Sequence, residues 1–276
     1  MPMTKTKVAK PFPLHLEDPD TTNFLNIIIY GDSDAGKTHL LGTALDCDEA
    51  YPPLLVDTDG GTITIADWRD REGKPIAIVR PRSWKEMQDL YNWMCHDNTT
   101  YRSILIDSLT ETQRERSMGE ILGEAGEDGY YKNLGQTKVA DRQDWLRSGN
   151  QMRKFIRAFR NLAYLRNTDR RVHVVMTALE RYDEKKRVIC PQLPGSLGLE
   201  CGALVDVLCR LSVHEFTDED TGEPFSRRHL LAKQYTDADG TRYMAKNRGD
   251  RLGRTLWDPT MASIIGAWTT DVIDEV

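Results

Sequence analysis

Short apolar runs alternate along the chain with segments whose apolar residues recur every three or four positions. Five runs have the length and β-branched content of buried strands, at residues 24–30, 54–56, 76–79, 104–106 and 172–176. Residues 83–96 and 152–163 carry apolar side chains at helical spacing. Strands that alternate with helices are typical of a doubly wound α/β sheet. We therefore expect one α/β domain over residues 23–276.

The pattern changes at three places. Residues 1–22 contain several prolines and few large apolar side chains, which predicts an N-terminal arm outside the core. Residues 114–137 are polar and rich in glycine, and an irregular stretch of that length is usually functional or disordered. The third change is a set of β-like runs joined by turns at Thr221-Gly222 and Asp239-Gly240, which predicts antiparallel strands at residues 204–213, 229–234 and 242–246.

Composition narrows the class of protein. The chain has 276 residues, of which 39 % are hydrophobic and 29 % charged, as in soluble globular proteins. No apolar run approaches the ~20 residues needed to cross a bilayer, and residues 1–16 lack the apolar centre of a secretory signal. The five cysteines form no CxxC pair, which argues against zinc ribbons and disulfide scaffolds. We expect a cytoplasmic protein with reduced thiols and no membrane partner.

Charge is distributed unevenly. The formal net charge is −6, which argues against a surface that binds nucleic acid all over. Residues 142–171, however, contain nine basic and two acidic side chains. This stripe is either a solvated helix face or a surface for phosphate binding or subunit contact.

A phosphate-binding loop follows the first predicted strand. Residues 31–38 fit the pattern G-x-x-x-x-G-K-[ST], with an apolar strand before them and an apolar helix after them. Glycines let the main-chain amides turn toward phosphate oxygens, and the start of the helix adds a favourable dipole. Lys37 is predicted to reach the β- and γ-phosphates and Thr38 to ligate Mg²⁺. The nucleotide site comprises Gly31, Asp32, Ser33, Asp34, Ala35, Gly36, Lys37, Thr38 and His39.

Two acidic residues are expected beside this loop. Asp107 follows the apolar run at 104–106, and ligands of open α/β sheets lie at the carboxyl ends of the strands. Asp107 is therefore a candidate partner of Mg²⁺. Asp59 follows the strand at 54–56 and is a candidate for the carboxylate that positions or activates the attacking water. The alternative for Asp59 is a turn in which aspartate simply precedes glycine.

Four elements in this order resemble the RecA-like recombinase ATPases, in particular the small phage nucleotide-binding proteins of that group. The family's phosphate loop matches 31–38 and its two acidic strands match Val56-Asp57-Thr58-Asp59 and residues 104–108. Its C-terminal basic finger is similar to Lys246-Asn247-Arg248. Over residues 24–256 the resemblance implies a RecA-type core that hydrolyses Mg-ATP. It also implies single-stranded DNA as partner, assembly into a ring or filament, and a role in annealing or strand exchange.

The resemblance also implies roles for residues far from the loop. Lys246 and Arg248 correspond to cations that reach the ATP of the adjacent subunit. Two regions correspond to DNA-binding loops, at about 112–140 with Tyr130, Tyr131 and Lys132, and at about 180–195 with Arg181, Tyr182, Lys185, Lys186 and Arg187. An ordinary surface loop and a β-hairpin with its tip at 183–186 are the alternatives. The arm with Phe12, Pro13 and Leu14 either joins a neighbour's sheet or is disordered.

The chain departs from the family at two points. The catalytic glutamate is replaced by the shorter Asp59, and the glutamine that senses the γ-phosphate has no clear counterpart, with Thr177 or Glu180 as substitutes. A nucleotide-dependent binding module that does not hydrolyse ATP is therefore an alternative function. A helicase-loader or terminase-like motor and a small-molecule kinase are further alternatives. A single-strand-binding protein or an exonuclease is a possible additional partner in a bacterial cytoplasm.

Overall fold

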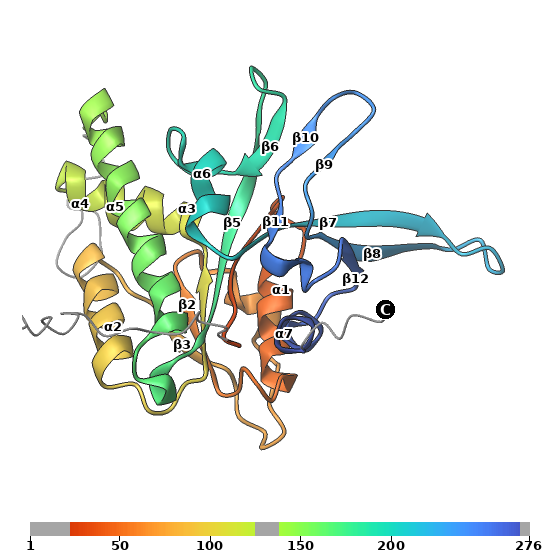
Figure 1. The fold of residues 1–276 in the computed structure, drawn as a ribbon, viewed down its shortest axis with the longest axis horizontal. Helices are drawn as coiled ribbons and strands as arrows, with labels where there is room; N and C mark the ends of the chain where they lie inside the picture. The colour runs from red at the N-terminus through yellow and green to blue at the C-terminus, as the bar shows by residue number, and fades with distance from the viewer. Residues whose placement is uncertain (1–22, 125–137, 271–276) are drawn as a thin grey trace, which may run out of the picture.

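A mostly parallel sheet forms the centre of the computed structural model, which describes residues 23–124 and 138–270 (Figure 1). The main path of the sheet runs in the order β12-β8-β7-β1-β5-β4-β2-β3. Its parallel part contains β1 (Asn26–Gly31), β2 (Pro53–Asp57), β3 (Ala77–Val79), β4 (Ser103–Asp107), β5 (His173–Asp183) and the start of β7 (Val207–Thr217). The expectation of a parallel α/β sheet with antiparallel C-terminal strands is confirmed.

The antiparallel strands lie mostly after residue 206. β8 (Pro224–Leu231) pairs with β7, and β12 (Thr255–Trp257) pairs with β8. The expected strand at 242–246 is divided into β10 (Arg242–Tyr243), which pairs with β9 (Tyr235–Thr236), and β11 (Lys246–Asn247), which pairs with β7. β6 (Val188–Pro191) returns along the end of β5. In the described residues all five cysteines are free thiols.

Helices cover both faces of the sheet, because alternate strand residues point to opposite sides. Ile27 and Ile29 pack toward α1 (Lys37–Gly42) and α7 (Met261–Thr269). Ile28 and Tyr30 pack toward α2 (Trp84–His96) and α5 (Arg142–Arg160). Caps fix the helix starts, since Ser83 accepts from the Glu86 amide and Asp141 from the amides of N-terminal residues of α5. Of the described helices, none has the length and apolarity to span a bilayer.

Two expectations about local structure are wrong in part. The polar stretch from residue 114 is helical as far as Leu122, through α3 (Leu109–Glu111), a wide helical turn at Thr112–Ser117 and α4 (Met118–Leu122). Buried contacts to α5, including Gln113 with Ser148, hold this polar segment in a helix. Residue 204 closes α6 (Leu197–Leu204), and β7 begins only at residue 207. The remaining polar residues, 125–137, and the N-terminal arm lie outside the described residues.

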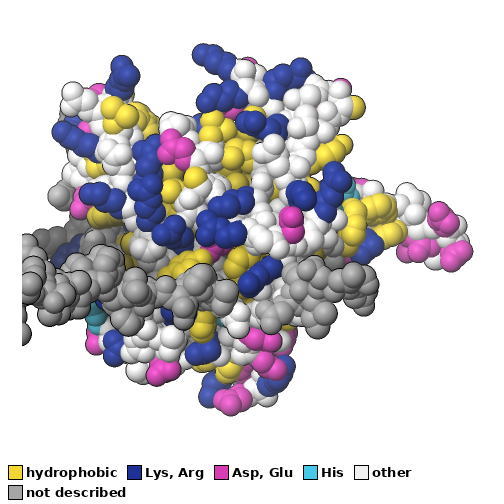
Figure 2. Space-filling view, viewed as in Figure 1, with side chains coloured by type: hydrophobic (Ala, Val, Ile, Leu, Met, Phe, Trp, Pro, Cys, Tyr) yellow, Lys and Arg dark blue, Asp and Glu magenta, His cyan; other side chains and the backbone are white. Residues whose placement is uncertain are grey.

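Three strands extend well past their predicted bounds. β5 continues to Asp183 and forms a hairpin with β6, so the tip at 183–186 is a turn, as one of the two alternatives expected. β7 and β8 continue beyond the body as a two-stranded ribbon (Figure 1). Acidic side chains gather at its tip, with hydrophobic side chains next to them (Figure 2). Cross-strand pairing extends both strands into polar sequence, where periodicity alone gives no signal.

Candidate functional site

The phosphate loop connects β1 to α1 at the carboxyl end of the sheet. Gly36 has φ +85°, a left-handed conformation that glycine adopts without a Cβ penalty, and α1 begins at the next residue. Lys37 is 7 % exposed, and its ammonium donates to the carbonyls of Gly31 at 3.1 Å and Asp32 at 2.6 Å. Burial lowers the pKa of Lys37, and the carboxylates of Asp107 and Asp59 oppose that change. A cation is therefore held inside a loop whose amides are suited to anions.

Asp107 stands at the end of β4 and accepts two short hydrogen bonds. The Thr38 hydroxyl donates at 2.6 Å and the Thr177 hydroxyl at 2.5 Å, one to each carboxylate oxygen. Asp107 is 2 % exposed, and burial raises its pKa although both hydroxyls lower it. The following peptide bond, to Ser108, is cis. The two predicted Mg²⁺ ligands, Thr38 and Asp107, thus lie in direct contact.

The oxygen atoms of Thr38 and Asp107 are suitable ligands for a hard cation. Hydroxyl and carboxylate oxygens are the groups that Mg²⁺ prefers, usually together with water and substrate phosphate. Among residues 23–124 and 138–270, no three His, Cys, Asp or Glu side chains are grouped so as to hold a metal. At this point the described structure pairs one carboxylate, of Asp107, with one hydroxyl, of Thr38.

The acidic strand β2 delivers two aspartates with different surroundings. Asp57 is 3 % exposed and accepts from the Gly60 amide at 2.7 Å and from Arg80 Nε at 2.9 Å. It therefore shapes the turn. Asp59 is exposed, and partial burial, followed by the nearby Glu111 carboxylate, raises its pKa. Lys37 acts on Asp59 in the opposite direction, so the loop lysine and this carboxylate influence one another.

Glu111 and Thr177 also belong to this region, although the sequence pattern does not mark them as its partners. Glu111 forms an ion pair with Arg114 at 3.0 Å and influences the Asp59 carboxylate. The sequence makes Thr177 a candidate γ-phosphate sensor, whereas in the structure its hydroxyl donates to Asp107. The other sensor candidate, Glu180, is bound by Arg210 at 2.8 and 3.1 Å. The available signal for Thr177 is a polar residue directly after the apolar run at 172–176, in a strand adjacent to β4.

Arg228 of β8 packs directly on the phosphate loop. A Cβ added to Gly36 would lie 2.3 Å from Arg228 Nε. This nitrogen is buried and has no hydrogen-bond partner in the described structure. Its position also affects His39, whose pKa is lowered by burial and then by the Arg228 charge. A phosphate bound at this loop would give Arg228 Nε the hydrogen-bond acceptor that it lacks in the described structure.

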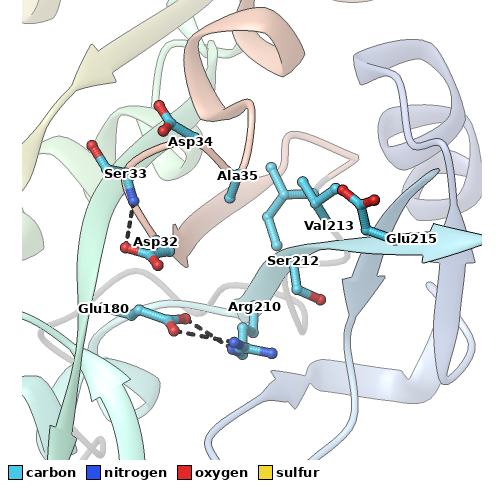
Figure 3. A pocket seen from close by; sticks show the side chains of 10 residues that line it. Asp32, Ser33, Asp34, Ala35, Glu180, Arg210, Ser212, Val213 and Glu215 are labelled. Carbon is cyan, nitrogen blue, oxygen red and sulfur yellow. Dashed lines mark hydrogen bonds and ion pairs between the residues drawn. The ribbon is translucent and has the colours of Figure 1, made fainter. Parts of the chain in front are cut away.

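A cavity of about 560 Å³ opens beside the outer side of the loop (Figure 3). Its size falls in the range of small-molecule sites. Lys37, Thr38 and Asp107 are not among its lining residues, so it adjoins the predicted phosphate site rather than containing it. The phosphate loop, β5 and β7 line the cavity. The lining residues are Asp32, Ser33, Asp34 and Ala35 of the loop, Glu180 of β5, and Arg210, Leu211, Ser212, Val213 and Glu215 of β7.

Comparison with known families agrees with this geometry. The model of the AAA domain family matches residues 23–249. The chain belongs to the AAA domain family. This AAA domain therefore has the P-loop NTPase fold of nucleotide-binding ATPases, as the loop, the buried lysine and the Thr38–Asp107 contact indicate. No curated protein matches the chain.

The predicted finger residues lie at the other end of this AAA domain's sheet. β11 pairs with the first residues of β7, and those pair in parallel with the start of β1, away from the phosphate loop. Lys246 Nζ donates to the carbonyls of Gly202 and Val205, both at 2.6 Å. Arg248 forms an ion pair with the buried Asp206 at 2.6 Å. Neither residue approaches the loop of its own chain, and a role at a neighbour's loop stays a prediction.

The two predicted DNA loops have different outcomes. Residues 112–124 of the first are helical or close the helix, while Tyr130, Tyr131 and Lys132 lie outside the described residues. The second is the β5–β6 hairpin, in which Tyr182 is 49 % exposed. Two of its basic residues already have hydrogen-bond partners. Arg181 donates to the Gly195 carbonyl at 2.8 Å, and Arg187 donates to the Asp239 carbonyl. Lys185 and Lys186 are exposed at the turn.

Proposed function

We propose that this AAA domain is a RecA-like ATPase that acts on single-stranded DNA in phage homologous recombination, by annealing or strand exchange. The nucleotide-binding part of the proposal rests on one observation. The Thr38 hydroxyl contacts the Asp107 carboxylate at 2.6 Å, beside the buried Lys37. A phosphate loop and an acidic strand end that meet in this way provide the two halves of a magnesium-nucleotide site.

The residues present divide the work of binding. The main-chain amides of 31–38 and the Lys37 ammonium hold phosphate oxygens, and Arg228 adds a second cation from β8. Thr38 and Asp107 hold the metal, whose charge offsets that of the phosphates when it is bound. Thr177 orients the Asp107 carboxylate through its hydroxyl.

Asp59 is the proposed general base or water-positioning residue. Asp59 is exposed, and its electrostatic coupling to Lys37 supports a place near the phosphate end of the nucleotide. Its raised pKa moves it toward the operating pH, which favours proton acceptance. In this proposal Asp57 has no chemical role, because the Gly60 amide and Arg80 already occupy its oxygens.

The single-stranded DNA part of the proposal is supported by the β5–β6 hairpin. β5 passes Thr177, which touches Asp107, and continues to Tyr182 in the hairpin. An exposed aromatic ring with lysines at the turn is the combination that binds single strands, by stacking and by phosphate contact. One strand thus connects the metal site to the proposed DNA site, so nucleotide state and DNA binding can influence each other.

Assembly is the remaining part of the proposal. Lys246 and Arg248 are proposed to act at the nucleotide of an adjacent copy, where a cation can raise the hydrolysis rate by ~10³–10⁵. Each would have to exchange its present partners, the carbonyls of Gly202 and Val205 and the carboxylate of Asp206, for that phosphate.

The test is a titration of ATP turnover against single-stranded DNA and against protein concentration. We expect the rate per chain to rise with both, Lys37→Ala to abolish ATP binding or turnover, and Tyr182→Ala to remove only the DNA stimulation. A rate that is flat in both titrations would refute the recombinase role while leaving the ATPase intact. Binding of ATP without turnover would favour the alternative of a nucleotide-dependent binding module.

A further inference from the structure

The ribbon formed by β7 and β8 carries a strip of aromatic side chains on its surface. Phe216 and Phe225 are stacked at 5.6 Å, and Trp257 of β12 lies 5.6 Å from Phe216 and 4.5 Å from His229. The two phenylalanines and Trp257 are 39–44 % exposed. We call Phe216, Phe225, His229 and Trp257 the aromatic strip. Aromatic rings that are ordered against one another yet remain open to solvent are typical of an interface.

The end of the same ribbon is strongly acidic. Glu219, Asp220 and Glu223 are exposed at the turn, and we call these three the acidic tip. Asp218 has a different role, since it accepts from the amides of Asp220 and Thr221 and so builds the turn. Hydrogen bonds to the carboxylate lower the pKa of Asp218. The acidic tip is therefore presented on a shaped turn at the far end of the ribbon (Figures 1 and 2).

The opposite side of the molecule offers the complementary chemistry. α5 presents Arg142, Lys154 and Arg157 to solvent, together with Leu146, which is 59 % exposed. We call these four residues the basic helix face. It lies opposite the buried side of α5, which contains Met152 and Phe155. In Figure 1 α5 lies at the left and the ribbon projects to the right beyond the body of the molecule, so one chain cannot bring them together.

We propose that the ribbon of one copy docks on the α5 helix of a second copy, with the acidic tip against the basic helix face and the aromatic strip covering neighbouring apolar surface such as Leu146. This inference deepens the self-association in the proposed function and rests on it. The acidic tip favours a protein partner, because it would repel a nucleic acid. The two surfaces differ, so the contact is heterologous and propagates head to tail into a ring or filament.

Two charge-reversed variants test the contact. The tip variant carries Glu219→Lys, Asp220→Lys and Glu223→Lys, and leaves Asp218 in place to preserve the turn. The helix variant carries Arg142→Glu, Lys154→Glu and Arg157→Glu. Each variant alone places like charges against each other, so we expect its association constant to fall at least about tenfold. Sedimentation velocity over a concentration series, with and without a non-hydrolysable ATP analogue, measures this.

A mixture of the tip variant and the helix variant is the decisive test of the contact. In an equimolar mixture, the basic tip of one variant fits the acidic helix of the other, and the unchanged pair of surfaces fits as well. We expect the mixture to assemble like the wild type, and a chain with all six reversals to assemble alone. A misfolded variant could not be rescued in this way.

Several results would overturn the proposal. These are a wild type that stays monomeric under both nucleotide conditions, single variants that assemble as the wild type does, and a mixture that stays dissociated. Loss of single-stranded DNA binding in the helix variant with assembly unchanged would instead assign the basic helix face to nucleic acid. ATP binding is measured in parallel and should be unchanged in all variants, so failure of the contact is distinguishable from failure of the nucleotide site.

Discussion

Thr177→Val tests whether the proposed metal site depends on the hydroxyl that donates to Asp107. The Thr177 hydroxyl donates to Asp107 Oδ1 at 2.5 Å, and both residues are buried. Valine keeps the shape of the side chain but leaves one carboxylate oxygen without this donor. A hydrogen bond to a charged group contributes about 1.5–3 kcal/mol, so we expect the free energy of unfolding at neutral pH to fall by about that amount.

The functional effect of the same change follows from orientation. Without the Thr177 donor, only Thr38 holds the Asp107 carboxylate, at its other oxygen. Loss of a residue that orients a metal ligand typically weakens metal affinity by about 10- to 100-fold. We expect calorimetry to show that loss for Mg-ATP and little change for ATP with the metal chelated. Thr177→Ser retains the hydroxyl and is the matched control.

The dependence on pH separates this explanation from a packing defect. The destabilisation by Thr177→Val should disappear in acid as Asp107 becomes protonated, because a neutral carboxyl no longer needs the donor to the same extent. A defect in packing would persist at every pH. Mg-ATP affinity in Thr177→Val equal to that of the wild type would show that Thr177 does not orient the metal ligand.

Three further predictions concern individual side chains. Burial lowers the pKa of His173 to about 4, so as the pH falls the unfolded chain takes up a proton before the folded chain does. We therefore expect the free energy of unfolding to drop by about 3 kcal/mol between pH 7 and 4. In His173→Asn this pH dependence, measured by urea denaturation, should flatten. Arg228→Ala should weaken ATP binding by about tenfold or more. Arg227→Ala is the control, because Arg227 is bonded to Asp258 and should not affect ATP affinity. Equal ATP affinities of the two variants in calorimetry would contradict the contact between Arg228 and phosphate. Gly36→Ala should lower the free energy of unfolding more than Gly73→Ala does. Both glycines have positive φ, which destabilises an alanine by about 1–2 kcal/mol, but only the Cβ at position 36 meets a neighbouring atom. Equal denaturation midpoints would count against that close approach.

The nucleotide site could be predicted to a large extent from local sequence. A strand, a glycine loop and a helix are consecutive, so the identity and spacing of residues 31–38 are enough to predict their conformation. Asp107 could be added because the carboxyl ends of parallel strands meet at one edge. The structure places Thr38 against Asp107 at 2.6 Å, as that reasoning requires.

The helical segment after Asp107 shows where local reasoning fails. Residues 114–122 are mostly polar and include Gly119, which favours a loop, yet buried hydrogen bonds of Gln113 and Ser117 with Ser148 hold this segment against α5. That partner is more than thirty residues away in the chain. The same limitation applies to the ribbon, whose strands gain stability from pairing with each other and not from a period-two pattern.

By itself, the sequence therefore determined the fold class, the phosphate loop and the carboxylate expected beside it, since each depends on neighbours in the chain or on a general rule of parallel sheets. Only the tertiary structure decided that Asp57 shapes a turn while Asp59 stays exposed, that Thr177 supports Asp107, and that Arg228 lies on Gly36. The physical reason is that burial, hydrogen-bond partners and charge coupling depend on distances in space, and β8 meets the phosphate loop across almost two hundred residues of chain.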